Sequence, residues 1–97
     1  NGKGVSQDNQ EAMRWYRLAA EQGYAIAQAN IGRLYVKGDG VIKDFVYAHM
    51  WFNIAAATGY TAAAEARSGL ENFMTKADIS LAQSLTRECI AKNYKDC

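Results

Sequence analysis

The side chains that could perform chemistry in this chain are few. There is a single histidine, His49, and there are two cysteines, Cys89 and Cys97. These three fall short of the four ligands that a structural zinc ion takes, and no Cys-x-x-Cys motif is present. We therefore expect no metal site and no cofactor. We expect His49 to lie on the solvated surface or between neighbouring structural units rather than to act in catalysis.

The hydroxyl and carboxyl side chains also lack the surroundings of an active site. No serine is followed three residues later by a lysine, and none lies in a Gly-x-Ser-x-Gly turn. Glu65 and Glu71 differ too much in helical phase to form an evident acid–base pair. We therefore predict no catalytic residues and expect that the protein is not an enzyme.

The elements that must position these residues follow from an internal repeat. A series of glycine, aspartate, alanine and tryptophan landmarks occurs twice, and each pair is separated by 36 positions. A fixed period of this size is typical of stacked helical repeats. The landmarks are Gly4, Asp8, Ala12, Trp15 and Gly23, followed by Gly40, Asp44, Ala48, Trp51 and Gly59.

Each landmark has a structural reason. Asp8 and Asp44 are suited to helix N-caps, and Gly23 and Gly59 to the left-handed position after a helix end. The Gly-x-Gly of residues 2–4 and 38–40 predicts a tight turn between units. Thr75, with Asp78 three residues later, predicts a further helix start. The predicted helices span residues 8–22, 25–37, 44–58, 62–73 and 75–92.

Residues 1–70 resemble a known family, the Sel1-like repeat, which is related to the tetratricopeptide repeat. The resemblance implies an all-α, right-handed α-α superhelix of about five antiparallel helices that ends in a C-terminal capping helix. The second copy departs from the family pattern at Ser68, which replaces Gly32, and at Glu71, which replaces Tyr35. The positions that match are Ala27, Ile31-Gly32, Tyr35, Gly38-Asp39-Gly40-Val41, Asp44, Ala48, Trp51-Phe52, Ala55-Ala56 and Gly59.

We expect a single domain over residues 1–97. Residues 1–24 correspond to the second half of a truncated repeat, 25–60 to a full repeat, 61–74 to the first helix of a last repeat, and 75–97 to the capping helix and tail. The chain opens within an inter-repeat turn, so we interpret it as a C-terminal fragment of a longer protein.

The recurring aromatic residues are expected to form the core, because their spacing is helical. The helix that would precede residue 8 is not in the chain, and its loss should uncover Met13, Trp15 or Tyr16. We expect self-association through this exposed first helix.

The resemblance also implies a function, that of a scaffold module binding a protein or peptide in the concave face of the solenoid. The alternative is a hydrolase or penicillin-binding-type activity on cell-wall-like substrates. In the tetratricopeptide relative, the first helix of each unit lines the concave surface. Carried over to this chain, the binding residues would be Ile26, Ala29, Arg33, Lys37, Ala62, Glu65, Gly69 and Asn72.

Charge and hydropathy exclude other partners. Eleven basic and ten acidic residues leave a net charge of +1, and no basic face predicts nucleic-acid binding. No apolar run reaches the roughly 18 residues of a membrane-spanning helix.

Cys89 and Cys97 predict a disulfide if the last helix is broken. Eight residues of unbroken helix would separate their Cα atoms by about 12 Å, whereas a disulfide requires roughly 4.4–6.8 Å. Asn93 tolerates the left-handed conformation that ends helices and lets the tail fold back. The alternative is a buried Cys89 that packs as a small apolar residue and a free Cys97. A disulfide implies the bacterial periplasm or a secreted location, and free thiols would instead fit the cytoplasm.

Overall fold

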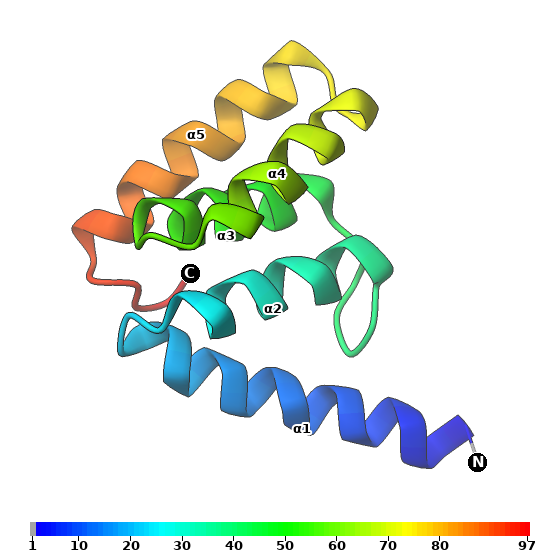
Figure 1. Ribbon diagram of the computed structural model, residues 1–97. Helices are drawn as coiled ribbons and strands as arrows, with labels where there is room; N and C mark the ends of the chain where they lie inside the picture. Colours follow the sequence, from blue (N-terminus) through cyan, green and yellow to red (C-terminus); the bar gives the residue numbers. More distant parts are fainter. Residues whose placement is uncertain (1) are drawn as a thin grey trace.

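The computed structural model describes the backbone of residues 2–97 and the side chains of residues 9–97. These residues form helices and loops and no strand, which confirms the predicted all-α class (Figure 1). The elements are α1 (Gly2–Glu21), α2 (Ala25–Lys37), α3 (Phe45–Ala57), α4 (Thr61–Leu70), the short 3-10 helix η1 (Glu71–Phe73) and α5 (Lys76–Ala91).

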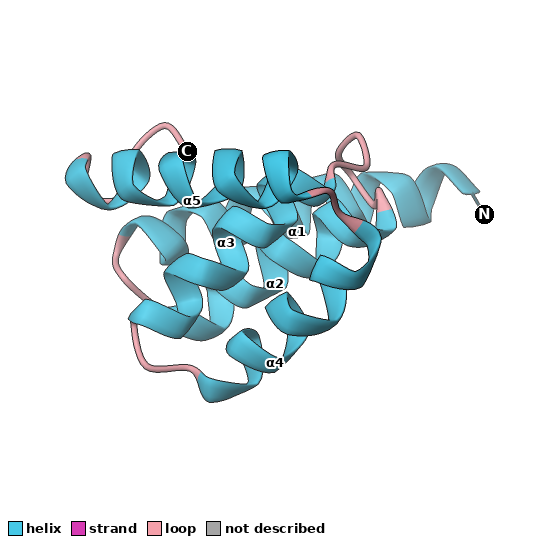
Figure 2. Cartoon of the chain, turned by 90° about the horizontal axis from the view of Figure 1, so that it is seen from above, coloured by secondary structure: helices cyan, strands magenta, loops and turns pink. Residues whose placement is uncertain are grey.

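Helix α3 is the centre of the fold. It packs against α2, α4 and α5, whereas α1 packs against α2. Consecutive helices run in opposite directions and are joined by short loops (Figures 1 and 2). No helix in the described part of the chain combines the length and the apolar character that a membrane crossing requires.

The predicted starts at Asp44 and Thr75 and the turn at Gly59 are confirmed, whereas the fourth predicted helix, 62–73, ends as α4 at Leu70 and continues as the 3-10 helix η1. The Asp44 carboxylate accepts a hydrogen bond from the Tyr47 backbone N–H at 3.1 Å. The Thr75 hydroxyl accepts one from the Asp78 N–H at 3.0 Å. Gly59 has a φ of +111°, in the region that a residue with a Cβ rarely adopts. These local interactions explain why the helix boundaries agreed closely with the sequence pattern.

The predicted start of the first helix is wrong. Helix α1 begins at Gly2 and not at Asp8, and the turn expected at residues 2–4 is helical. The side chain of Asp8 lies outside the described residues. In the second copy, the Asp44 N–H donates to the carbonyl of Tyr35, which holds the loop before α3 in place.

Two apolar clusters form the core. The first lies between α1, α2, α3 and α5 and contains Trp51, which is 1% exposed. The second lies between α2, α3 and α4 and contains Phe52. A Cβ added at Gly32 would lie 2.8 Å from the Phe52 ring, so glycine at this position allows α2 and α3 to approach each other closely.

Not all the recurring aromatic residues are core residues, contrary to the prediction. Trp15 and Tyr24 are each 65% exposed. Of the three residues expected to be uncovered on the first helix, Trp15 is exposed, Met13 is buried and Tyr16 is half-buried. Tyr24 lies at the same open end, and its counterpart Tyr60 packs against the second core cluster.

The C-terminal tail folds back as predicted, and Cys89 and Cys97 form a disulfide with a Cα–Cα distance of 5.7 Å. Helix α5 ends before Asn93, which has a φ of +57°. The N–H of Tyr94 then donates to the carbonyl of Cys89 at 2.9 Å. The Tyr94 side chain packs against the first core cluster, so the tail attaches the capping helix to the first repeat.

Candidate functional site

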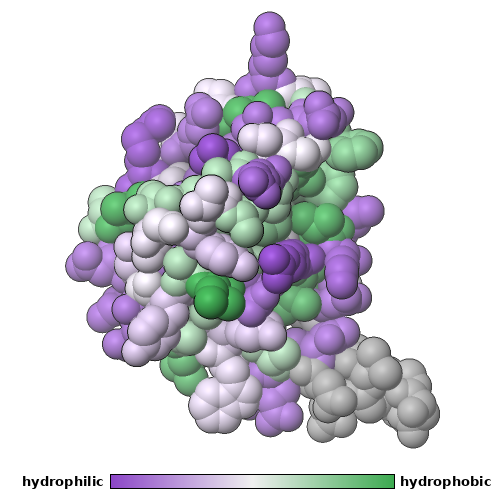
Figure 3. All heavy atoms as spheres, in the orientation of Figure 1, coloured by the Kyte–Doolittle hydropathy of each residue, from purple (hydrophilic) through white to green (hydrophobic). Residues whose placement is uncertain are grey.

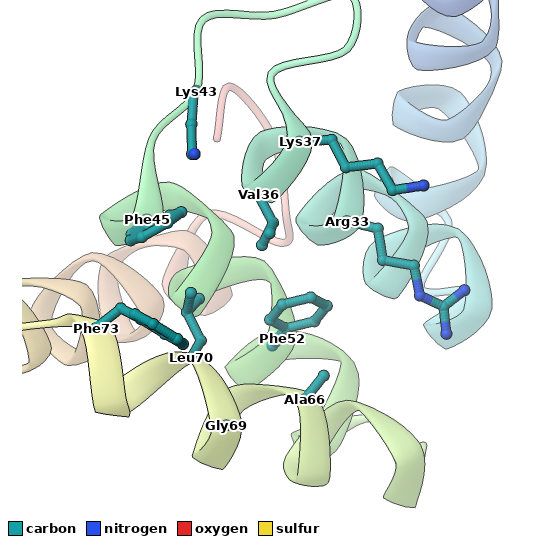
Figure 4. Close-up of a pocket in the computed structure, with 10 residues that line it drawn as sticks. All are labelled: Arg33, Val36, Lys37, Lys43, Phe45, Phe52, Ala66, Gly69, Leu70 and Phe73. Atoms are coloured by element: carbon teal, nitrogen blue, oxygen red, sulfur yellow. The ribbon is translucent and has the colours of Figure 1, made fainter.

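A pocket of about 490 Å³ opens between the C-terminal halves of α2 and α4 (Figure 4). Helix α3 and the loop before it complete its lining. A volume of this size is in the usual range for ligand pockets and accommodates one or two large side chains. The lining residues are Arg33, Val36, Lys37, Lys43, Phe45, Phe52, Ala66, Gly69, Leu70 and Phe73.

The two walls of the pocket are made by equivalent positions of the two repeats. Arg33 and Lys37 on α2 are 36 residues before Gly69 and Phe73 on α4 and η1. The repeat therefore places the same backbone positions on opposite sides of one pocket. The sequence differs between the walls, so that one is cationic and the other is apolar.

The apolar wall carries an unusually exposed aromatic side chain. Phe73 is 75% exposed, although it lies beside Leu70 and Phe45 in the pocket (Figure 4). Phe52 lies at the base and is buried against α2. An exposed ring next to buried apolar side chains is a surface that a partner can cover at a gain in free energy.

The cationic side carries Arg33, Lys37 and Lys43. Arg33 donates a hydrogen bond to the Asn30 side chain at 3.1 Å. The Lys43 ammonium lies 5.2 Å from the centre of the Phe45 ring, within cation–π range. In Figure 4, Lys43 points toward Phe45, whereas the side chains of Arg33 and Lys37 extend from α2 away from the apolar residues. No acidic residue lines the pocket.

The structure brings together three of the predicted binding residues, Arg33, Lys37 and Gly69. Ala29 is 1% exposed and packs in the second core cluster, so its side chain cannot contact a partner. The other predicted residues are exposed but lie outside the pocket. The prediction took residues from the whole length of two helices, whereas the pocket lies only between their C-terminal halves. The residues outside the pocket are Ile26, Ala62, Glu65 and Asn72.

The sequence-based reasoning missed the residues that give the pocket its apolar character, above all Phe73 and Phe45. A signal for Phe73 was available, since it stands where the preceding copy has Lys37. A charged residue replaced by an aromatic one at a surface position indicates a specialised surface. Phe45 follows the N-cap Asp44 directly, a position that periodicity alone does not assign to a face.

A second cluster of polar side chains surrounds His49, which is completely buried and therefore does not lie on the solvated surface, the first of the two positions expected for it. Its Nε2 lies 2.7 Å from a carboxylate oxygen of Glu71. Its Nδ1 lies 3.1 Å from the amide nitrogen of Asn53. Asn53 also contacts Arg67 at 2.9 Å and Thr86 at 3.3 Å. The cluster thus connects α3 with α4, η1 and α5.

The hydrogen bonds indicate which ring nitrogen of His49 donates and which accepts. Arg67 donates to the side-chain oxygen of Asn53, so the amide N–H groups of Asn53 face His49 and Thr86. The Nδ1 of His49 therefore accepts, and its Nε2 carries the proton that is donated to Glu71. Both ring nitrogens are engaged in a buried site, and this arrangement gives His49 the role of a packing residue between the last repeat and the capping helix.

No group of three or more His, Cys, Asp or Glu side chains that could hold a metal ion occurs among the described side chains.

The surface of α1 provides the other apolar feature. Trp15 and Leu18 are 65% and 54% exposed on this helix. On the face seen in Figure 3, apolar residues are interspersed with polar ones. The pocket differs from this surface in two ways. It is concave, and its charged lining residues are all basic.

Comparison with known proteins agrees with the helical repeat. The family model described as Sel1 repeat matches residues 1–24 and 25–60. No curated protein sequence matches the chain. The family match covers more than half of the chain, and its two segments end at Tyr24 and Tyr60, which are 36 positions apart like the landmarks of the internal repeat. The chain belongs to the Sel1 repeat family.

Proposed function

We propose that this chain is a non-enzymatic scaffold module that binds a peptide segment of a partner protein in the pocket between α2 and α4. Sel1 repeats are generally protein-interaction scaffold modules. The proposal rests on the exposure of one aromatic side chain. Phe73 is 75% exposed at the edge of a pocket of about 490 Å³.

A partner that covers Phe73 would gain free energy from the burial of its apolar surface. A large aromatic side chain has about 150–250 Å² of surface, and burial of apolar surface contributes about 25 cal/mol per Å². Covering most of Phe73 would therefore contribute roughly 2–4 kcal/mol. That contribution is typical of a hot-spot residue at a protein interface, where a few aromatic side chains dominate the affinity.

The rest of the pocket supports binding over catalysis. Its lining combines aliphatic, aromatic and basic side chains, without a histidine, cysteine, serine or carboxylate. The side chain of His49 is completely buried and hydrogen-bonded at both ring nitrogens. No observation favours the alternative activity on cell-wall-like substrates.

We propose further that the protein works in an oxidising compartment, such as the bacterial periplasm or the exterior of the cell. The support is the disulfide between Cys89 and Cys97. Such bonds persist outside the reducing cytosol.

Selection of peptides from a displayed random library on the purified chain tests the proposed site. Selected peptides should bind the Phe73→Ala variant at least tenfold more weakly, because the variant removes the exposed ring (~1.4 kcal/mol per factor of ten). Leu81→Ala is the matched control, since Leu81 is 51% exposed on α5 and lies outside the pocket. Peptides that bind Phe73→Ala as well as the native chain would refute the assignment of the pocket.

A further inference from the structure

The pocket has a charge that the chain as a whole does not have. Three of its ten lining residues are basic and none is acidic, whereas the whole chain has a net charge of +1. Among the described residues, none of the three basic side chains forms an ion pair. Charge left unpaired beside an exposed apolar surface favours a ligand of opposite charge.

We infer that the ligand of this pocket is an acidic peptide segment with one large apolar side chain. This inference rests on the proposed function and names the chemistry of the partner. The apolar side chain enters between Phe73 and Leu70, and acidic residues beside it face Arg33 and Lys37 on the opposite wall. The repeat supports this division, because the two walls have equivalent backbone positions and differ in side chains.

The basic residues do not contribute equally. Lys43 also lines a second, open depression together with Phe45, Asp44 and Asp78. These carboxylates offset part of the positive charge of Lys43. Arg33 and Lys37 line only the pocket among the depressions described, so they carry most of the attraction for an acidic ligand.

Fluorescence anisotropy with a matched set of short labelled peptides tests the inference. Each peptide carries one central phenylalanine, flanked by acidic, by uncharged polar or by basic residues. A further acidic peptide has alanine in place of phenylalanine. The acidic phenylalanine peptide should bind most tightly, roughly tenfold better than the uncharged one, and its affinity should fall as the salt concentration rises.

Reversing the charge of the basic wall tests whether Arg33 and Lys37 attract the acidic peptide. Arg33→Glu combined with Lys37→Glu should weaken the acidic peptide roughly tenfold and leave the uncharged peptide nearly unchanged. Arg14→Glu is the control, because Arg14 is exposed on α1 and lies outside the pocket. Circular dichroism verifies that all variants fold.

The outcomes separate the two claims. If the uncharged or basic peptide binds as tightly as the acidic one and depends on Phe73, the acidic ligand is excluded while the proposed function stands. If no peptide binds at millimolar concentration, both the ligand and the proposed site are overturned. Preference for the acidic peptide that survives the double charge reversal would also overturn the inference.

Discussion

The two ends of the helical stack contain equivalent residues in opposite environments. Trp15 is 65% exposed and Trp51, 36 positions later, is 1% exposed. Leu18 is 54% exposed, and its counterpart Ile54 is completely buried. The residue types are the same or similar, so the difference in exposure comes from the helices that surround them. Helix α3 has α2 on one side and α5 on another, whereas the described part of α1 packs mainly against α2.

The C-terminal end is closed by interactions that the repeat itself does not contain. Met13 and Tyr35 of the first copy are replaced by His49 and Glu71, which lie 2.7 Å apart. Thr86 of α5 joins this polar cluster through Asn53, and the disulfide fixes the tail. The packing of α5 on the rest of the molecule therefore uses specific hydrogen bonds and a disulfide, whereas the packing between α1, α2 and α3 uses mainly apolar contacts.

The largest expected difference is between the two tryptophans. Trp51→Ala removes a buried ring and should lower the free energy of unfolding by about 3–5 kcal/mol, which threatens the fold of so small a domain. Trp15→Ala should change it by less than about 1 kcal/mol, because the ring is already largely in water. Urea denaturation of both variants provides the measurement. Equal losses would contradict the contrast between the two ends.

The disulfide should have the next largest effect. The loop it closes spans eight positions, and the loop-entropy relation gives about 2.5 kcal/mol for this length. Cys97→Ser should lower the free energy of unfolding by about that amount. A reducing agent should destabilise the native chain equally and leave the variant unaffected. A native chain indifferent to reductant during unfolding would show that the tail does not stabilise the closed end.

The His49–Glu71 pair should behave as a unit. Glu71→Tyr alone places the first-copy residue beside His49 and leaves the buried Nε2 proton without its acceptor, at a cost of about 1–3 kcal/mol. Adding His49→Met removes the buried donor that Glu71→Tyr leaves unpaired, and the double variant should recover at least about 0.5 kcal/mol. Strictly additive losses in thermal or urea unfolding would mean that the two positions are independent.

Two helical glycines should respond in opposite directions to alanine. At Gly32 the gain in helix propensity, up to about 1 kcal/mol, opposes a clash with Phe52 that costs about 1–3 kcal/mol. Gly32→Ala should therefore destabilise by about 1 kcal/mol. At Gly69 no atom lies within 4 Å of an added Cβ, so Gly69→Ala should stabilise by roughly 0.5–1 kcal/mol. Stabilisation by both variants would show that α2 and α3 can separate without cost.

The smallest expected effect is weak self-association through the exposed face of α1. Light scattering should show the apparent mass of the chain rising with concentration. Trp15→Ser combined with Leu18→Ser should abolish the rise, and Leu81→Ser, an equally exposed position on α5, should not. A native chain that stays monomeric at high concentration would count against a role of this surface in self-association.

Much of the fold could be predicted because its signals are local. The cap at Asp44, the turn at Gly59 and the break at Asn93 each depend on a few neighbouring residues. The start of α1 was missed because the N-cap at Asp44 also depends on a hydrogen bond to the carbonyl of Tyr35 on the preceding helix. Local chemistry therefore predicts where helices begin only when no contact with another helix is needed.

The candidate site was harder to predict. Helical phase identified Arg33, Lys37 and Gly69 but could not show that the pocket occupies only one end of the two helices. It also could not show that His49 is buried, because its hydrogen-bond partner Glu71 lies 22 positions away in sequence and Thr86, which joins the cluster through Asn53, lies 37 positions away. Pairings between distant positions determine both features, and a single sequence does not display them.

The most direct test of the account is a two-dimensional NMR titration of the isotopically labelled chain with the acidic phenylalanine peptide. The account predicts that the amide signals of Val36, Gly69 and Phe73 shift together and saturate, while those of Trp15 and Leu18 do not move. Shifts confined to Trp15 and Leu18, or the absence of any saturable shift, would contradict the claim that the pocket between α2 and α4 is the binding site.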